Sequence, residues 1–228
     1  MIPVAENNSW LRQRLEAAFR SALTRAYETV RVQPDDYLMR LRMVYGIPVS
    51  SYDGLFSLPV SDLDSIARQT VGGAMKMAGI EGAGLGFGGF VTLVPDLGIL
   101  SAITLRMVQK LSLIYGFQFN TEEEVAELWI AAASAAGIDL SKEVLEKTVL
   151  KGFVERVIGR MAARLSTEFA EKIVARAIPV LSSAVGAVLN YYFVRAWGNR
   201  VQAHFRRRHL EERSRRSDRG ILLQAAPD

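Results

Sequence analysis

Apolar residues recur along the chain at intervals of three and four, which predicts amphipathic helices rather than strands. The first such segment runs from Ser9 to about Val30, with arginine and glutamate side chains on its polar face. Further segments follow at about 37–45, 62–77, 97–115, 122–136, 152–177 and 180–197, and another helix opens at Ser141. No segment shows the apolar–polar alternation of a strand. We therefore expect an all-α fold, a single multi-helix bundle.

Capping and breaking residues divide these segments. Pro34 should end the first helix, because proline disfavours helical backbone at the residue before it. Thr121 and Glu124 have the spacing of a capping box for the helix that begins after Thr121. Pro95 is expected to break the chain, so that Asp96 becomes the N-cap of the 97–115 helix.

Glycine is concentrated in the segment 72–98, which holds nine of the 18 glycines. Gly82 and Gly86, and likewise Gly84 and Gly88, are one helical turn apart, a spacing that lets a second helix approach closely. Each interior glycine costs about 1 kcal/mol relative to alanine, so packing must compensate. We expect this segment and the 97–115 helix to form a glycine-rich central helical hairpin, buried in protein or lodged in lipid.

The composition argues against several kinds of chemistry. The chain has no cysteine, which excludes thiol nucleophiles and cysteine-ligated metals. Its two histidines, His204 and His209, lack further metal ligands and lie far from the serines of the body, so we expect both to be solvated. The G-x-G-x-x-G match at 84–89 does not follow a strand, as a dinucleotide site requires. We predict no catalytic residue, no metal and no cofactor, which favours a non-enzymatic role without excluding an enzyme.

Four charged residues lie in apolar surroundings near the predicted hairpin: Glu81, Asp96, Arg106 and Lys110. Capping explains Asp96 most simply, whereas a buried Asp96 would need a partner for its charge. If the glycines open a cavity beside the 97–115 helix, these four side chains would line it. The alternative function is therefore a soluble bundle that binds a small apolar ligand, or an enzyme of unknown class, in a cavity near Asp96.

Positive charge is concentrated near the C-terminus. The segment 206–219 contains seven arginines and three acids, an excess of four positive charges that equals the net charge of the whole chain. The rest of the chain is close to neutral, which makes nucleic acid an unlikely partner. We expect residues 1–205 to form the helical domain and residues 206–228 to form a charged, flexible tail that loses helical structure after Arg213.

Two uncharged stretches, 82–95 and 177–194, indicate a membrane surface, although a spanning helix needs about 20 apolar residues and neither reaches that length. A hairpin dipping into one leaflet and the core of a soluble bundle both remain open. The chain start lacks the apolar run of a signal peptide, so we expect a cytoplasmic protein at the inner face of the cell membrane. The expected membrane-contacting side chains are Tyr191, Tyr192, Trp197, Arg206, Arg207 and Arg208.

The run 82–116, GAGLGFGGFVTLVPDLGILSAITLRMVQKLSLIYG, resembles the EcsC family of bacterial proteins, as do the flanking segments 45–67 and 178–193. The resemblance covers roughly residues 10–210. A weaker similarity reaches the membrane-associated helical domain fused to some bacterial GTPases. The resemblance implies an intracellular, membrane-associated helical protein whose family is named for a gene of an ABC-transporter operon. It implies no particular activity and no catalytic residue.

These observations favour a non-catalytic, peripheral membrane-associated helical protein that acts through a membrane lipid or a membrane-protein partner. The soluble ligand-binding bundle is second. Nucleic-acid binding through the basic tail is third. The oligomeric state is left open by the sequence.

Overall fold

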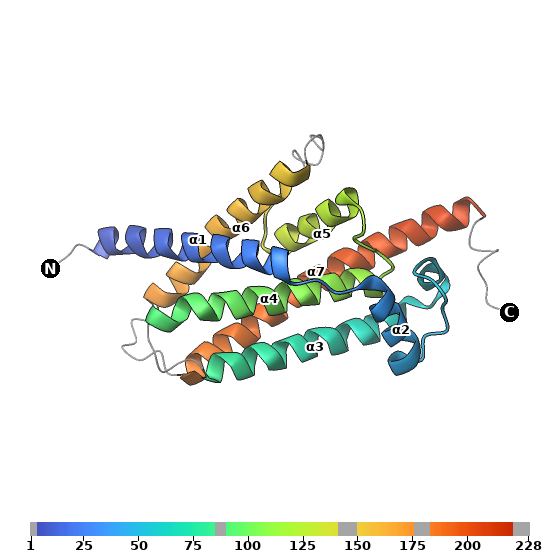
Figure 1. Cartoon of the computed structure of the whole chain (residues 1–228), viewed down its shortest axis with the longest axis horizontal. Helices are drawn as coiled ribbons and strands as arrows, with labels where there is room; N and C mark the ends of the chain where they lie inside the picture. Colours follow the sequence, from blue (N-terminus) through green and yellow to red (C-terminus); the bar gives the residue numbers. More distant parts are fainter. Residues whose placement is uncertain (1–3, 85–89, 141–149, 176–182, 221–228) are drawn as a thin grey trace.

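The computed structural model of the chain describes residues 4–84, 90–140, 150–175 and 183–220, and the side chains of residues 9–80, 97–140, 152–171 and 190–220. Within these residues the chain forms seven α-helices and one short 3-10 helix, and no strand, so the predicted all-α fold is confirmed (Figure 1). The helices are α1 (Val4–Thr29), α2 (Pro34–Tyr45), η1 (Asp53–Ser57), α3 (Val60–Gly84), α4 (Phe90–Ile114), α5 (Glu122–Ala135), α6 (Leu150–Ala175) and α7 (Ser183–Asp218).

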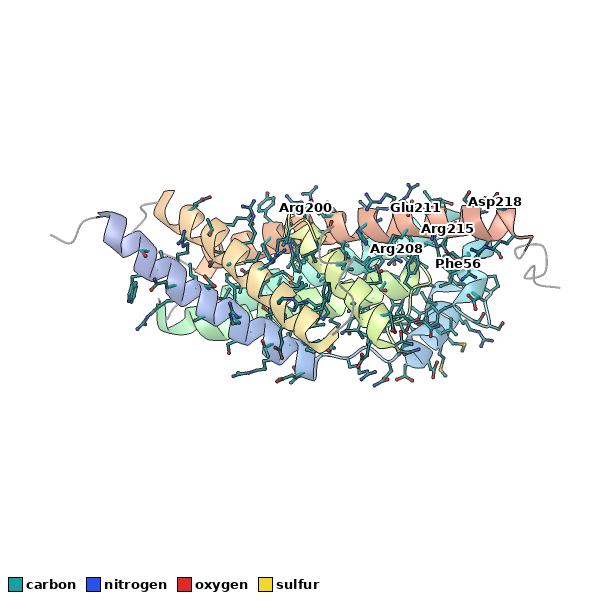
Figure 2. All side chains as sticks on the ribbon, turned by 90° about the horizontal axis from the view of Figure 1, so that it is seen from above. Phe56, Arg200, Arg208, Glu211, Arg215 and Asp218 are labelled. Atoms are coloured by element: carbon teal, nitrogen blue, oxygen red, sulfur yellow. The ribbon has the colours of Figure 1, made fainter. Side chains whose placement is uncertain are left out.

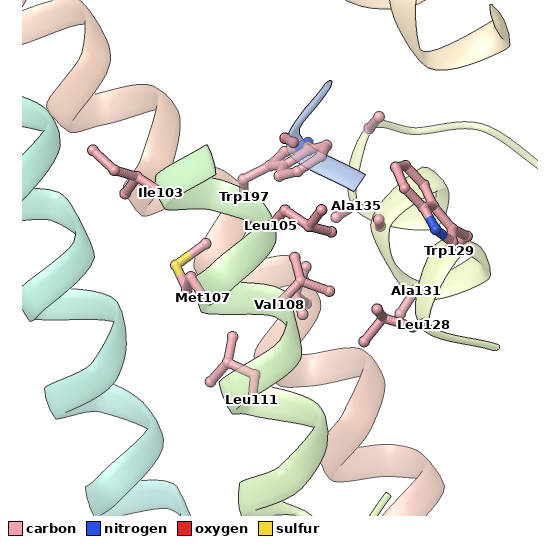
Figure 3. Packing of buried hydrophobic residues seen from close by; sticks show 14 of the residues in the cluster. Ile103, Leu105, Met107, Val108, Leu111, Leu128, Trp129, Ala131, Ala135 and Trp197 are labelled. Carbon is pink, nitrogen blue, oxygen red and sulfur yellow. The ribbon is translucent and has the colours of Figure 1, made fainter. Parts of the chain in front are cut away.

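Helix α4 forms the centre of the bundle. It packs against α1, α2, α3, α5 and α7, and its apolar side chains are buried on several sides of the helix, among them Leu100, Val108 and Leu111 (Figure 3). A helix that is apolar all round must be surrounded by protein or lipid. Among the described residues, Leu97–Ile114 is the one segment long and apolar enough to cross a membrane, and 72% of it is buried inside the bundle. Burial in protein therefore accounts for most of its apolar character.

The start of α4 differs from the prediction. Because α4 begins at Phe90, Pro95 lies within the helix and Asp96 is not its N-cap. A proline within a helix lacks the bond that its own N–H would donate to the carbonyl four residues earlier, here Val91 in the first turn, and its ring crowds that carbonyl. The packing of α4 on α3 and the other helices compensates for that single loss, so the proline does not break the chain. Helices α3 and α4 pack against each other as the predicted hairpin (Figure 1).

The closest approach of two helices within the described side chains occurs at a glycine that the sequence did not single out. A Cβ atom added to Gly198 of α7 would lie 2.7 Å from Val71 Cγ1 on α3 and 3.0 Å from Met107 Sδ on α4. Only hydrogen fits at this position, so Gly198 lets α7 lie directly against the hairpin. The signal in the sequence was a lone glycine within an otherwise helix-forming segment.

Two of the four predicted close-packing glycines lie at the end of α3. Gly82 and Gly84 are in the last turn of α3. Their contacts are not described, because they lie outside the residues whose side chains the structure describes. Gly86 and Gly88 lie outside the described residues. Close packing of these glycines therefore stays a prediction.

Helix α7 corrects the prediction of a flexible tail. It continues to Asp218, because its buried face extends through the arginine-rich segment: Val201, Phe205 and His209, each one turn apart, are all buried. The expected loss of helical structure after Arg213 is wrong, because α7 continues to Asp218. Arg213 itself donates from Nη1 to the Leu58 carbonyl at 2.9 Å. Figure 2 shows this end of α7 running beside Phe56.

The segment between α2 and α3 anchors the end of α7. Tyr52 and Phe56 of this segment are buried. Phe56 lies so close to Gly116 that a Cβ atom there would be 2.8 Å from Phe56 Cε2, and Gly116 has a φ of +91°, which favours glycine. The predicted capping box of α5 is confirmed, with Thr121 accepting from the Glu124 amide and Glu124 accepting from the Thr121 amide at 3.0 Å.

Candidate functional site: a basic pocket between α2, α3 and α4

A pocket of about 170 Å³ opens between α2, α3 and α4. Three cationic side chains line it: Arg40 from α2, and Arg106 and Lys110 from α4. Arg106 and Lys110 are four residues apart, which places them on the same face of α4. None of the residues described as lining the pocket is acidic. We call this feature the basic pocket.

The positive charges of the basic pocket repel one another. Burial lowers the pKa of Lys110, and repulsion from Arg40 and Arg106 lowers it further. Within the part of the chain that the structure describes, none of the three forms an ion pair with a carboxylate. Arg40 and Arg106 are exposed, so water screens their charges, but the half-buried ammonium group of Lys110 is less well solvated and a nearby anion would stabilise its charged form. Such unfavourable clusters of charge are found most often at functional sites.

Polar groups that carry no formal charge complete the pocket. Tyr37 is almost fully buried, and burial raises its pKa to about 12, so its hydroxyl stays protonated at neutral pH. Thr70 lies beside this hydroxyl, but their geometry does not meet that of a hydrogen bond within the described structure. Gln69 adds a side-chain amide to the lining. The Tyr37 hydroxyl is therefore a buried donor at the pocket, available to an oxygen acceptor.

Large exposed apolar side chains lie on α2 and α3, two of the helices that line the pocket. Met77 of α3 lines the pocket, and Ile80 follows three residues later on the same side of α3. On α2, Met43 and Val44 lie one turn beyond Arg40. Met43 is 80% exposed and Ile80 is 72% exposed, values that are high for such side chains. We call the five exposed residues the apolar border: Met39, Met43, Val44, Met77 and Ile80.

The structure brings together two of the four predicted pocket residues. Arg106 and Lys110 both line the basic pocket. Glu81 lies in α3 and Asp96 in α4, but both side chains are outside the described ones. Arg40 was not among the predicted pocket residues, because its position at the pocket depends on how α2 packs against α4.

A larger cavity of about 500 Å³ lies between the end of α1, α4 and α5. Its buried polar residue, Gln109, already has partners: it donates to the Val30 carbonyl at 3.0 Å and accepts from the Val32 amide at 2.9 Å. These bonds hold the chain after α1 against α4. This amide is therefore satisfied within the bundle, and the charged residues at the cavity, Arg31 and Glu122, are of opposite sign, unlike the cations of the basic pocket.

The predicted membrane-contacting aromatic residues have different environments. Trp197 is only 5% exposed and stacks on Phe193 with ring centroids 5.7 Å apart, so it belongs to the core (Figure 3). Tyr191 is half-buried, whereas Tyr192 is 59% exposed. Only Tyr192 of these three offers most of its surface to a partner.

The predicted membrane-contacting arginines are engaged within the bundle. Arg206 Nε lies 2.9 Å from Asp64 Oδ2 on α3, and Arg208 Nη1 lies 2.9 Å from Glu127 Oε2 on α5. Arg207 is exposed. Its neighbour Arg208 is labelled on the same stretch of α7 in Figure 2. The arginine cluster therefore ties α7 to its neighbours, which the sequence could not show because its carboxylate partners are distant in the chain.

The prediction that both histidines are solvated is wrong. His209 is fully buried, with its Nδ1 2.9 Å from the Tyr115 carbonyl oxygen and its ring stacked on Phe56 at 4.8 Å. Both ring nitrogens of His204 are buried without a hydrogen-bond partner among the described residues. Burial lowers the pKa of both, that of His204 to about 4, so both are neutral at pH 7. In the described part of the chain, no three His, Asp or Glu residues are grouped to hold a metal ion.

Comparison with known proteins agrees with the family resemblance that the glycine-rich run indicated. The EcsC protein family model matches residues 5–210, which include every helix that lines the basic pocket. Protein EcsC of Bacillus subtilis (strain 168) is 24% identical over 159 residues, which cover 68% of this chain and 67% of that protein. No solved structure matches the chain. The chain belongs to the EcsC protein family.

Proposed function

We propose that this protein is a non-catalytic, peripheral membrane-associated protein that contacts the lipid surface with the apolar border around the basic pocket. The observation that carries this proposal is the exposure of large apolar side chains on α2 and α3, above all Met43 and Ile80, together with a cluster of cations that have no carboxylate partner among the described residues. Isolated exposed apolar residues are common on protein surfaces. Five of them on two helices that share one cationic pocket form the combination that a lipid headgroup region favours.

The expected strength of this contact is that of a reversible association. Full burial of one such side chain contributes about 1.5–3 kcal/mol, and the five residues of the apolar border would be only partly inserted. Their sum is on the order of 5 kcal/mol, similar to the marginal membrane binding that a single myristoyl chain provides at about 10⁴ M⁻¹. Each cation near an anionic surface adds about 1 kcal/mol. Because the inner leaflet is anionic, we place the protein at the cytoplasmic face of the cell membrane.

Co-flotation with protein-free liposomes tests the proposal. The wild-type protein is compared with Met43→Asp/Met77→Asp, which places two carboxylates in the apolar border. A matched control, Ala17→Asp/Ala203→Asp, adds the same charge at exposed positions of α1 and α7, and circular dichroism checks that all three are folded. The wild type and the control should float with vesicles, whereas the border variant should stay at the bottom of the gradient.

The use of liposomes also separates a lipid partner from a membrane protein. Binding to vesicles that contain no protein supports lipid contact through the apolar border. A wild-type protein that fails to float with any vesicle would overturn the proposal of lipid contact. Equal flotation of the wild type and the border variant would show that the membrane is bound by another surface.

A further inference from the structure

We propose that the basic pocket binds the phosphate group of an anionic phospholipid, so that the pocket selects the lipid while the apolar border holds the protein at the surface. This inference rests on the proposed membrane association and specifies the chemistry of its partner. It concerns Arg40, Arg106 and Lys110, which belong to two helices far apart in the sequence.

The charges of the pocket favour an anion as the ligand. Two guanidinium groups and one ammonium group converge on a pocket whose described lining contains no acid. Guanidinium groups present paired N–H donors that match the oxygens of phosphate, and an ammonium group adds a compact charge. A bound anion would also relieve the repulsion that lowers the pKa of Lys110. The donor set therefore suits a phosphate better than any neutral or cationic ligand.

The size of the pocket restricts the ligand further. Its volume of about 170 Å³ is well below the roughly 300–1,000 Å³ of sites that enclose a drug-sized molecule. The pocket cannot enclose a whole nucleotide or coenzyme, whereas it can hold a single phosphate group. The Tyr37 hydroxyl, buried without a partner at the pocket, supplies a further donor to a phosphate oxygen.

The apolar border favours a lipid over a soluble phosphate ester. Met77 lines the basic pocket and also belongs to the apolar border, so the two features are continuous. A soluble phosphate ester would leave these methionine and isoleucine side chains in water. A phospholipid held by its phosphate would bring its acyl chains and its neighbours in the leaflet to the same side chains. A phosphomonoester headgroup, as in phosphatidic acid, carries more negative charge on its phosphate than a phosphodiester does and should bind better.

The experiment uses the full chain and vesicles of two compositions: phosphatidylcholine alone, and phosphatidylcholine with phosphatidic acid. The variants Arg106→Gln and Lys110→Gln each remove one charge from the basic pocket. Arg68→Gln is the matched control, because Arg68 is exposed on α3 and does not line the pocket. The wild type should bind the phosphatidic acid vesicles at least tenfold more tightly than the neutral ones. Each pocket variant should lose about tenfold of that affinity, the control less than threefold, and neutral vesicles should bind all forms alike.

Different outcomes contradict different parts of the account. An equal loss of binding in Lys110→Gln and Arg68→Gln would overturn the pocket, because diffuse attraction to the surface would then explain the preference. A wild type that does not prefer phosphatidic acid would overturn it as well, while leaving the apolar border as the membrane contact. A titration with soluble glycerol 3-phosphate, followed by NMR of Lys110, should show weak binding; binding as tight as that to vesicles would overturn the assignment to a lipid.

Discussion

The stability of the fold should depend on pH through His204, whose two ring nitrogens lie buried in α7 without a hydrogen-bond partner among the described residues. Burial is the main cause that lowers its pKa from 6.5 to about 4, and the nearby cations of Arg208 and Arg207 lower it further. Its ring packs edge-on against Phe205 at 5.4 Å, so protonation would place a charge beside an apolar core side chain. The folded protein therefore keeps His204 neutral at a pH where the unfolded chain protonates it.

The sign and size of the effect follow from this difference in pKa. Between pH 6.5 and pH 4 the unfolded state binds more protons than the folded state, so the free energy of unfolding falls as the pH falls. The effect is absent above pH 7. At pH 5 it amounts to about 1.5 pKa units at 1.36 kcal/mol each, or about 2 kcal/mol from His204. Burial also lowers the pKa of His209, which acts in the same direction.

Urea unfolding at pH 7.5 and pH 5.0, followed by circular dichroism, measures this loss. The wild type and His204→Leu are compared, with Ala203→Leu as a control that changes an exposed neighbour and no titratable group. His204→Leu should lose about 2 kcal/mol less than the wild type between the two pH values, and the control should follow the wild type. If the wild type and His204→Leu lose the same free energy, within about 0.5 kcal/mol, the argument from buried histidine is refuted.

Three further changes have predictable outcomes. Gly198→Ala should lower the free energy of unfolding by about 1–3 kcal/mol in urea unfolding, because its Cβ would lie 2.7 Å from Val71 Cγ1; no loss would show that the helices separate easily. A chain that ends at Phe205 should have a free energy of unfolding lower by at least about 2 kcal/mol in urea unfolding, because His209 would no longer cover the core. Full stability of this chain would mean that α7 ends earlier. Lys110→Met should raise the melting temperature, on the order of 1 °C, since it removes a repelled charge, and a lower melting temperature would contradict the electrostatics of the basic pocket.

Helices whose ends are set by neighbouring residues were predictable from the sequence. The capping box of Thr121 and Glu124 and the left-handed Gly46 that closes α2 depend on contacts a few residues apart. Pro95 was misleading because proline has a weaker effect near the start of a helix than in its interior, and because tertiary packing compensates for one lost hydrogen bond.

The end of α7 could not be predicted from charge alone. A dense run of arginines usually indicates a solvated segment, but these arginines bind groups from distant parts of the chain. Arg206 pairs with Asp64, and Arg216 Nη1 lies 2.8 Å from Asp53 Oδ1. The residues one turn before and one turn after Phe205 are buried like Phe205 itself. Their spacing continues the buried face of the helix through the charged segment, and it was the signal in the sequence that the helix continues.

The candidate site was predictable in part for the same reason. Arg106 and Lys110 share a face of one helix, so their spacing was enough to associate them. Arg40 and Tyr37 join them only because α2 packs against α4, a tertiary contact that no local pattern encodes. The exposure of the apolar border likewise becomes visible only when the fold shows which apolar residues have no partner.

The most direct test of the account is co-flotation of the wild type and Met43→Asp/Met77→Asp with vesicles that contain phosphatidic acid. We expect the wild type to float and the variant to remain unbound, while both keep the same helical content. Flotation of both proteins to the same extent, or of neither, would contradict the central claim that this face of α2 and α3 contacts the membrane.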